Sequence, residues 1–481
     1  MQNKQTKGNK LWRALLCAAL AALLCAALLL SGCSSGPYVT GIVYAGGDGS
    51  QSVYTVQYSD GSTTSFTVEN GKDGADLDIE EVYAAYCERY GDIEFSEFLE
   101  TYLSVNAGDN SAVIQKTLQS AVTVHAEFCV TQSSGWPFGS TLKGLSRSIG
   151  SGVIYAIDDD SVYIVTNYHV VYNASANSDN GSNIGRKLVC YLYGSEDKDK
   201  PAQINGETDE LGYPVLDYGD YAIECEFVGG SYSNDLAVLR ADKADVFAVN
   251  DSVAAASVAD GYAVGQTAIA IGNTEAEGIS VTEGIVSVER EEVLFTGGRT
   301  QEVLRIDTAI YSGNSGGGLF DLKGRLIGIT NGGNEEDQNI NYAIPLQVVR
   351  GTVENILFHA NDGDDLTNGL LTPTLGIGLE SQNARYVYDA AAGVGKIYED
   401  VSVAEVTSRS IAAELGVQEG DLLRAFTVNG TTREIARSYD IGDLRLTLRP
   451  GDVLSFTVER DGDTVVTDTY TLTSDDFSVL S

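Results

Sequence analysis

Three short segments of the chain place a histidine, an aspartate and a serine in settings that suit nucleophilic catalysis. His169 lies at the end of a strand-like run, Asp235 comes directly before another, and Ser315 lies inside the glycine-rich segment Gly313–Gly318. A serine hydroxyl becomes a strong nucleophile when a base takes its proton, and the base needs a carboxylate to fix its tautomer and stabilise its charged form. The three segments therefore supply a nucleophile, a base and an orienting carboxylate.

The glycines around Ser315 have a mechanical role in this hypothesis. Glycine adopts positive φ without strain, so a loop bracketed by Gly313 and by Gly316–Gly318 can turn its backbone N–H groups toward one point. That point is an oxyanion hole, and we expect the N–H groups of Gly313 and Ser315 to be its donors. Losing one such donor typically costs about 100- to 1,000-fold in rate.

The chain between residues 111 and 344 must bring the three side chains together. Short segments rich in Val, Ile and Tyr, punctuated by Gly, predict a mainly β structure of sandwich or barrel type, too long for one small barrel. Helical spacing over Leu346–His359 predicts a helix after it, and the polar residues 361–367 predict a linker.

The stretches around His169, Asp235 and Ser315 resemble the trypsin-like serine proteases, and among them the HtrA (DegP-like) family, whose patterns run TNxHV, DLAVL and GNSGGPL. Further matching stretches, in the family's order, are Gly150–Ile154, Ala270–Asn273, Val281–Ser287 and Asn341–Pro345. The resemblance covers residues 112 to 350. It implies a chymotrypsin/trypsin-like pair of six-stranded β-barrels within a protease domain at 109–360, with the site in the cleft between them.

Carried over residue by residue, the resemblance implies that His169 is the general base, Asp235 its orienter and Ser315 the nucleophile of peptide-bond hydrolysis through an acyl-enzyme. This chemistry needs no cofactor. The resemblance also implies a homotrimer. Ala309 is expected near the base of the S1 pocket, where no Asp is present to pair with Lys or Arg, so small or medium apolar P1 residues are the expected preference.

The chain departs from the family pattern next to the nucleophile. Gly318 stands where the family usually has Pro, and Tyr311-Ser312 replaces a common Asn-Pro. Fewer prolines predict a loop around Ser315 with more conformational freedom than usual. This difference concerns the resting geometry of the oxyanion hole and leaves the roles of the three side chains unchanged.

Residues 368–475 resemble a PDZ domain of the HtrA type. The resemblance rests on Leu375–Gly378, Ser410–Leu423 and Val428–Gly430. Such a domain binds an extended peptide as an added strand and holds its terminal carboxylate with loop amides, here those of Leu375, Gly376 and Ile377. The alternative is a module that only braces the protease.

The N-terminus has the layout of an export signal. Basic residues precede the uncharged run Ala14–Leu30, which is slightly short for a comfortable bilayer span. The run ends in Leu30-Ser31-Gly32-Cys33, which resembles a bacterial lipobox, so residues 1–32 are predicted to be a lipoprotein signal peptide and Cys33 the lipidated residue. An uncleaved anchor helix and ordinary signal-peptidase cleavage are the alternatives. We expect a lipid-anchored protein on the extracytoplasmic side of the cell membrane.

The stretch between the signal and the protease carries no catalytic pattern. Alternation over Tyr38–Val68 predicts a small β-meander in a tether at 33–75, and helical spacing over Asp78–Leu103 predicts two short helices in a module at 76–108.

Export makes the cysteines after the signal, Cys87, Cys129, Cys190 and Cys225, candidates for disulfides. Cys190 and Cys225 lie on two predicted strands that could be neighbours, and buried unpaired thiols are the alternative. His125 and His359 are interpreted as structural, and the acid-rich insertion Glu196–Asp220 as a solvated loop.

The composition of the chain argues against nucleic-acid binding and against a metal site. The chain has 68 Asp and Glu against 30 Lys and Arg, a formal charge of −38, which repels the phosphates of a nucleic acid. Seven cysteines without CxxC or Cys/His spacing predict no metal site.

Together these observations predict an extracytoplasmic, membrane-anchored serine endopeptidase that degrades or processes unfolded or damaged envelope proteins, with a PDZ domain that binds peptide C-termini. The first alternative is an envelope chaperone or peptide-binding protein with little proteolysis. An esterase ranks third because the sequence lacks the Gly-x-Ser-x-Gly elbow of α/β-hydrolases.

Overall fold

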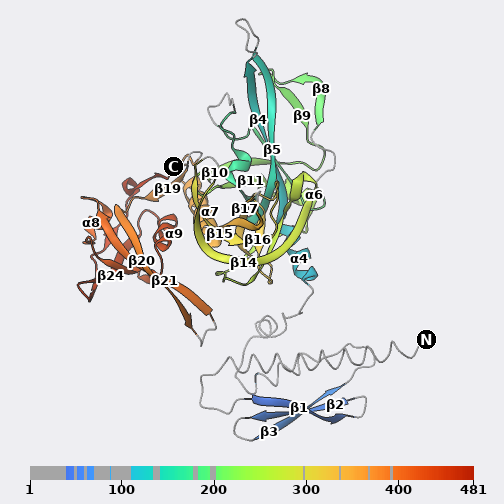
Figure 1. The fold of residues 1–481 in the computed structure, drawn as a ribbon. Helices are drawn as coiled ribbons and strands as arrows, with labels where there is room; N and C mark the ends of the chain where they lie inside the picture. The colour runs from blue at the N-terminus through green and yellow to red at the C-terminus, as the bar shows by residue number, and fades with distance from the viewer. Residues whose placement is uncertain are drawn as a thin grey trace. The chain divides into compact units, whose positions relative to one another are not determined.

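The computed structural model of the chain describes two compact units, one formed by residues 1–107 with 386–397 and the other by residues 108–385 with 398–481 (Figure 1). The residues it describes are 39–47, 51–58, 62–69, 87, 110–133, 141–176, 183–195, 202–295, 298–334, 337–366, 369–389 and 394–480. Cys33 and the predicted helices of the 76–108 module, apart from a helical Cys87, lie outside them. Among the described residues, no helix has the length and apolar character needed to cross a membrane.

The N-terminal strands form a three-stranded antiparallel sheet. Its strands are β1 (Val39–Gly47), β2 (Gln51–Tyr58) and β3 (Thr63–Glu69). They pair in chain order, with Tyr54 of β2 opposite Phe66 of β3. The sheet is the meander that the alternation of this region predicts.

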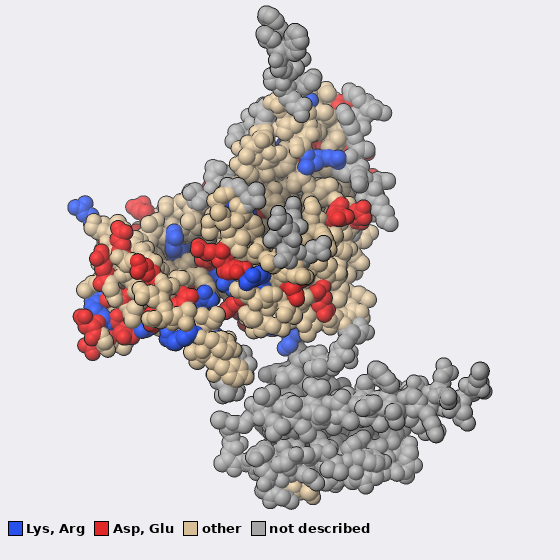
Figure 2. Space-filling view, viewed as in Figure 1, with Lys and Arg blue, Asp and Glu red and all other residues tan. Residues whose placement is uncertain are grey.

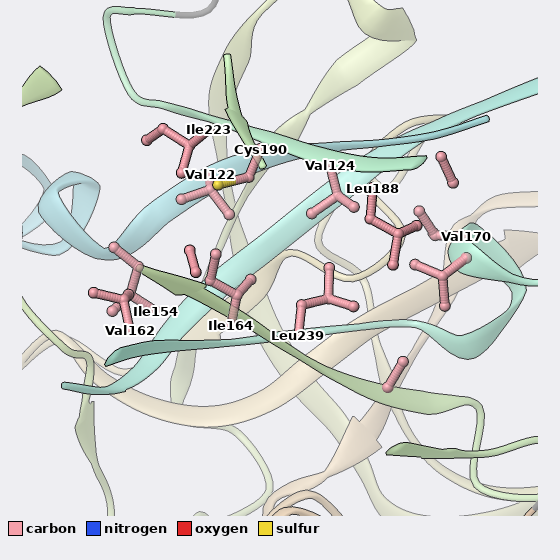
Figure 3. Packing of buried hydrophobic residues seen from close by; sticks show 14 of the residues in the cluster. Val122, Val124, Ile154, Val162, Ile164, Val170, Leu188, Cys190, Ile223 and Leu239 are labelled. Atoms are coloured by element: carbon pink, nitrogen blue, oxygen red, sulfur yellow. The ribbon is translucent and has the colours of Figure 1, made fainter. Parts of the chain in front are cut away.

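After residue 110, a six-stranded antiparallel barrel closes in the order β10-β11-β6-β5-β4-β7. Its strands are β4 (Ala121–Ser133), β5 (Thr141–Ile157), β6 (Ser161–Thr166), β7 (Lys187–Leu192), β10 (Ile223–Ser231) and β11 (Leu236–Asp242). Short helices accompany it: α4 (Ser111–Thr117), the 3₁₀ helix η1 (Leu118–Ser120), α5 (Tyr168–Val171) and α6 (Lys243–Val249). Inward-facing residues such as Val124, Ile154, Ile164 and Leu239 fill the interior (Figure 3). In Figure 1 the β4–β5 hairpin extends well beyond the barrel.

A second sheet has the order β12-β17-β16-β13-β14-β15-β18, and a further pairing of β17 with β18 closes six of its strands into a ring. The elements are β12 (Ser257–Val258), β13 (Thr267–Asn273), the 3₁₀ helix η2 (Thr274–Ala276), β14 (Ile279–Leu294), β15 (Thr300–Ile306), β16 (Gly318–Phe320), β17 (Arg325–Asn334) and β18 (Asp337–Pro345). Ala270, Val286, Leu304 and Ile327 lie in its core. The two rings confirm the predicted pair of six-stranded barrels.

An apolar cluster between the barrels holds them together. The first barrel contributes Val165 and Leu236, the second contributes Ile271 and Phe320, and all four are buried. The predicted helix is present as α7 (Leu346–Asn361), which adds Val349, Val353 and Ile356 to the same cluster. Burying each such side chain contributes roughly 1.5–3 kcal/mol. The contact therefore fixes the loops of one barrel against those of the other.

The C-terminal region has its own sheet and core. Its sheet has the order β20-β21-β22-β24-β25, with β23 on β22 and β26 on β24, and β19 pairs with β27 apart from it. The elements are β19 (Leu370–Pro373), β20 (Ile377–Asp389), β21 (Val394–Val406), α8 (Ile411–Glu414), β22 (Leu422–Val428), β23 (Thr431–Glu434), α9 (Tyr439–Thr447), β24 (Val453–Arg460), β25 (Asp463–Val466), β26 (Tyr470–Thr471), the 3₁₀ helix η3 (Ser474–Asp476) and β27 (Phe477–Leu480). Leu415, Phe456 and Leu444 belong to its core cluster.

The acid-rich insertion is more ordered than expected. Its second half forms β8 (Ala202–Thr208) and β9 (Pro214–Asp217), which pair with each other. Tyr213 is fully buried, and the Tyr218 hydroxyl donates to the buried Glu127 carboxylate at 2.7 Å. The expectation of a solvated loop is therefore wrong for this half, because two tyrosines pack the insertion onto the barrel.

Both signs of charge occur on the face shown in Figure 2, where Lys and Arg side chains lie scattered among Asp and Glu side chains of the described residues.

Candidate active site

The first barrel supplies His169 through the single-turn helix α5. The neighbours Tyr168, Val170 and Val171 are buried in the barrel core, and Figure 3 shows Val170 at the edge of that cluster. The His169 side chain in contrast is 44% exposed. Packing on both sides therefore holds the helix in place and leaves the imidazole at the surface.

Asp235 lies directly before β11, and both its backbone conformation and a hydrogen bond to its carbonyl fix its position. Its φ of 53° is a left-handed conformation, which Asp tolerates better than most residues. Asn167, the residue before α5, donates from Nδ2 to the Asp235 carbonyl at 2.9 Å. This bond connects the two loops that carry the predicted base and its carboxylate.

The structure brings His169 and Asp235 together. The Asp235 Oδ1 accepts the backbone N–H of His169 at 3.0 Å, and Oδ2 lies 2.7 Å from His169 Nδ1. An ionised carboxylate can only accept, so Nδ1 carries the proton and the neutral ring presents Nε2 as its basic nitrogen. This is the tautomer that a general base requires.

The Asp235 carboxylate is fully buried and stays ionised. Burial acts to raise its pKa, but the charges and hydrogen bonds of His169 and Arg299 outweigh burial and hold the pKa of Asp235 below its ordinary value. Arg299 was not found by sequence reasoning, because it belongs to no recognised motif and lies 64 residues from its partner.

The loop around Ser315 needs its glycines. Gly313 and Gly316 have φ of 93° and 87°. A Cβ on Gly313 would lie 2.1 Å from the Asn273 carbonyl oxygen, and one on Gly316 would lie 2.2 Å from that of Ser151. Both the backbone conformation and the close approach therefore exclude larger residues.

Two backbone amides of this loop are left without a protein partner. The N–H groups of Asn314, Gly316 and Gly317 donate to backbone carbonyls, whereas within the described residues those of Gly313 and Ser315 donate to no protein acceptor. Unpaired N–H groups are uncommon in folded loops. The two groups are the predicted oxyanion donors.

The Ser315 hydroxyl is turned toward the second barrel. Its Oγ donates to the Asn331 carbonyl at 2.9 Å, and in the described part of the chain it forms no hydrogen bond with His169. A rotation about one side-chain bond is therefore needed before the hydroxyl can donate to the imidazole.

Ser151, on β5, ties the nucleophile loop to the first barrel. Its backbone N–H donates to the Ser315 carbonyl at 2.8 Å, and its hydroxyl donates to the Gly313 carbonyl at 2.7 Å. The same hydroxyl oxygen accepts the backbone N–H of Asn273 at 2.7 Å. Sequence reasoning recorded Ser151 within a matching stretch but gave it no role. Despite the missing prolines, the loop is anchored from both barrels.

The other predicted positions are placed as follows. Ala309 is partly buried, and its carbonyl accepts the hydroxyl of Thr282 at 2.8 Å. Leu375 and Gly376 precede β20, and their carbonyls accept the backbone N–H groups of Ala412 and Thr407 at 3.0 and 2.9 Å. Gly376 has a φ of 72°, and a Cβ there would collide with Ser410. Ile377 begins β20.

The remaining cysteines and histidines have structural surroundings. Cys190 and Cys225 lie on the paired strands β7 and β10, as predicted, and both are free thiols. His125 packs against the ring of Tyr191, and burial together with the charge of Arg147 lowers its pKa to about 4. The buried His359 contacts Asp364 at 3.1 Å.

The comparisons with known proteins cover the part of the chain that carries the site. The family model of the trypsin-like peptidase domain matches residues 150–329, which include His169, Asp235 and Ser315. The serine protease Do-like HtrB of Bacillus subtilis is 30% identical over 327 residues. The chain is a homologue of the HtrA/DegP serine proteases.

The extent of this homology differs between relatives. The match to Bacillus subtilis HtrB covers 65% of this chain and 60% of that protein. This chain therefore spans about three fifths of the length of that relative. The serine protease Do-like HtrA of Lactococcus lactis is 26% identical, with 74% of this chain and 80% of that protein covered. The solved structure of the HtrA-type protease AlgW with decapeptide is 22% identical, covers 76% of this chain and 98% of its own, and has a TM-score of 0.45.

Proposed function

We propose that the chain is a serine endopeptidase that hydrolyses unfolded or damaged envelope proteins by way of an acyl-enzyme. The observation that carries the proposal is the buried carboxylate of Asp235, which binds both the backbone N–H and Nδ1 of His169 at 3.0 and 2.7 Å. The fully buried carboxylate orients an imidazole that is itself 44% exposed, which is the arrangement that a general base requires.

In the proposed mechanism, a bound peptide displaces the Ser315 hydroxyl from the Asn331 carbonyl and the hydroxyl turns to His169 Nε2. His169 takes the proton as Ser315 Oγ attacks the scissile carbonyl, and the ionised Asp235 stabilises the imidazolium. His169 then gives the proton to the leaving amine, which completes the acyl-enzyme. Water, activated by the same imidazole, hydrolyses the ester and restores Ser315.

The oxyanion of each tetrahedral intermediate is assigned to the N–H groups of Gly313 and Ser315. Both lack a protein acceptor among the described residues, so no internal hydrogen bond must break when the oxyanion forms. The anchoring of this loop through Ser151 supports a site that is formed before substrate binds. Ala309, which carries no charge to pair with Lys or Arg, remains the proposed S1 residue.

The C-terminal region is proposed to be the PDZ domain that binds peptide C-termini. Its own sheet and core cluster support this proposal, and the backbone N–H groups of Leu375 and Gly376 donate to no acceptor within the described residues. Together with Ile377 they are the proposed carboxylate loop. Cys33 is the proposed lipid anchor, and the anchor places the protease on the extracytoplasmic side. Incorporation of radiolabelled fatty acid that is lost in Cys33→Ser tests the anchor.

Proteolysis itself is tested with the full-length chain purified in detergent. A substrate protein whose cysteines are reduced and carboxymethylated stays unfolded, and the same protein with native disulfides serves as the folded control. The wild type is expected to cut the unfolded form alone, Ser315→Ala is expected to cut neither, and mass spectrometry of the new termini identifies the P1 residue.

Two results contradict the proposal. Equal cleavage by the wild type and Ser315→Ala assigns the activity to another group. Cleavage by neither, with or without C-terminal peptides, while both suppress aggregation of the unfolded substrate, favours the chaperone.

A further inference from the structure

Arg299, the residue directly before β15, makes a second set of contacts with the Asp235 carboxylate. Its Nη2 donates to Asp235 Oδ2 at 3.0 Å, the oxygen that also binds His169 Nδ1. Its Nη1 donates to the Tyr232 carbonyl at 3.2 Å. The centre of the guanidinium lies 5.5 Å from the ring of Tyr232 and 5.8 Å from that of Phe295. The side chain is 14% exposed, so several groups fix its position.

Gln301, two residues after Arg299 and within β15, also binds the loop that carries Asp235. Its Nε2 donates to the carbonyl of Asn234, the residue before Asp235, at 2.8 Å. Its Oε1 accepts Asn331 Nδ2 at 2.7 Å, and Asn331 is the residue whose carbonyl binds the Ser315 hydroxyl. Arg299, directly before β15, and Gln301, within it, therefore both connect the second barrel to the Asp235 loop of the first.

The charges around the carboxylate are few among the described residues. The ion pairs of Asp235 in the described residues are with His169 of α5 and with Arg299, the residue before β15. Tyr232, from the turn after β10, stacks on Arg299, and Tyr168 of α5 contacts the Tyr232 ring edge to face. While the imidazole is neutral, Arg299 balances the carboxylate. Protonation of His169 brings a second positive charge to the same carboxylate, and the two cations repel each other.

We propose that Arg299 is a positioning residue of the active site, which holds the Asp235 carboxylate in register with His169 and opposes premature protonation of the imidazole. The inference rests on the proposed function, since it assumes that His169 acts as the base. Its consequence is that the shared carboxylate stabilises the imidazolium less than an unshared one would.

The titration of His169 tests the proposal without any need for activity. The chain has three histidines, so NMR spectra of the full-length chain with isotope-labelled histidine are simple, and a His169→Gln variant assigns the signal. Removing the positive charge in Arg299→Gln is expected to move the titration midpoint of the His169 ring upward by about one pH unit. Arg299→Lys keeps the charge and is expected to leave the midpoint within about 0.3 unit of the wild type.

The matched control is Arg305→Gln. Arg305 lies on β15, the strand that follows Arg299, and its ion pair is with Glu291, at 3.1 Å. The control is expected to leave the midpoint unchanged. The same effect should be seen in the pH dependence of kcat/KM. The acidic limb of the Arg299→Gln profile is expected to move to higher pH together with the NMR midpoint. Arg299→Lys retains the wild-type limb and loses roughly two- to tenfold on the plateau, because Lys lacks the fixed fork of donors.

Two outcomes overturn the inference. Coincident midpoints for Arg299→Gln and the wild type would show that the charge does not act on His169. A one-unit shift in Arg299→Lys would show that geometry rather than charge is responsible, and this variant also decides the case if Arg299→Gln does not fold. Absence of cleavage by the wild type with a shifted NMR midpoint in Arg299→Gln contradicts the protease proposal but supports the contact.

Discussion

The two halves of the candidate site differ in how complete they are. In the base half, formed by His169, Asp235 and Arg299, the Asp235 side-chain oxygens accept hydrogen bonds at 2.7–3.0 Å from these two neighbours. In the nucleophile half, formed by Gly313–Gly317 with Asn331, two backbone amides are unpaired within the described residues and the Ser315 hydroxyl binds the Asn331 carbonyl. The polar groups of the base half are therefore paired with one another, whereas among the described residues the nucleophile half contains two unpaired hydrogen-bond donors.

Electrostatics explains this difference. A buried carboxylate must find partners within the protein, since an unpaired buried charge costs several kcal/mol, so the base half has to be complete before substrate arrives. An oxyanion hole must keep its donors for a charge that exists only during the reaction. Under the proposed function, the base half is therefore paired within the folded protein, and the nucleophile half keeps its two N–H groups free for the oxyanion.

The largest expected effect comes from breaking the base half at its carboxylate. Asp235→Asn keeps the shape, but its amide can donate to Nδ1 and so favours the wrong imidazole tautomer. We expect a loss of about 10⁴-fold in kcat, measured with a quenched fluorescent peptide. Asp242→Asn, at the other end of β11, is the control and should retain the wild-type rate. A loss below tenfold in Asp235→Asn would remove the carboxylate from the mechanism.

The next effect comes from the nucleophile half. Gly313→Ala places a Cβ 2.1 Å from the Asn273 carbonyl oxygen at a residue with φ of 93°, so the backbone must turn and its N–H with it. We expect kcat to fall about 100- to 1,000-fold with little change in KM. Gly261→Ala, where a Cβ meets no atom within 4 Å, is the control. Full activity of Gly313→Ala would place the oxyanion donors elsewhere.

A smaller effect is expected at the connection between the halves. Ser151→Ala removes the hydroxyl that bridges the Gly313 carbonyl and the Asn273 N–H, while the backbone bond to Ser315 remains. Leaving such groups without a partner costs about 1–2 kcal/mol, so kcat/KM should fall roughly 5- to 30-fold. Ser151→Thr keeps the hydroxyl and should recover part of the rate. Equal rates in Ser151→Ala and the wild type would show that the loop needs no such anchor.

The smallest expected effect is on stability and comes from His125, a partly buried histidine of the first barrel. Its pKa is lowered from 6.5 to about 4, so between these values the unfolded chain binds more protons than the folded one. The free energy of unfolding should therefore fall as pH drops from about 6.5 to 4, by at most about 3 kcal/mol from this residue. Guanidinium unfolding of His125→Gln should show a weaker pH dependence in this window than the wild type. An identical pH dependence of the unfolding free energy in His125→Gln and the wild type would contradict a folded state in which His125 is neutral.

The sequence predicts those parts of the molecule that are local or that follow a pattern. Strand-rich segments, the helix now seen as α7 and the neighbouring strands of Cys190 and Cys225 are of this kind. Contacts between distant residues without a motif were missed, as Arg299 and Ser151 show. The packing of Tyr213 and Tyr218 was missed for a related reason: the charge of the insertion indicates solvent exposure, and two isolated aromatic residues show no periodicity.

The central claim is that His169 activates Ser315 as a nucleophile. The measurement that tests it most directly is labelling with an alkyl fluorophosphonate, in which a serine oxygen attacks phosphorus, fluoride leaves and the base takes the proton. Intact-mass analysis of the full-length chain should show one adduct, peptide mapping should place it on Ser315, and His169→Ala should slow labelling by at least about 1,000-fold. No adduct, an adduct on another residue, or an equal rate in His169→Ala would contradict the account.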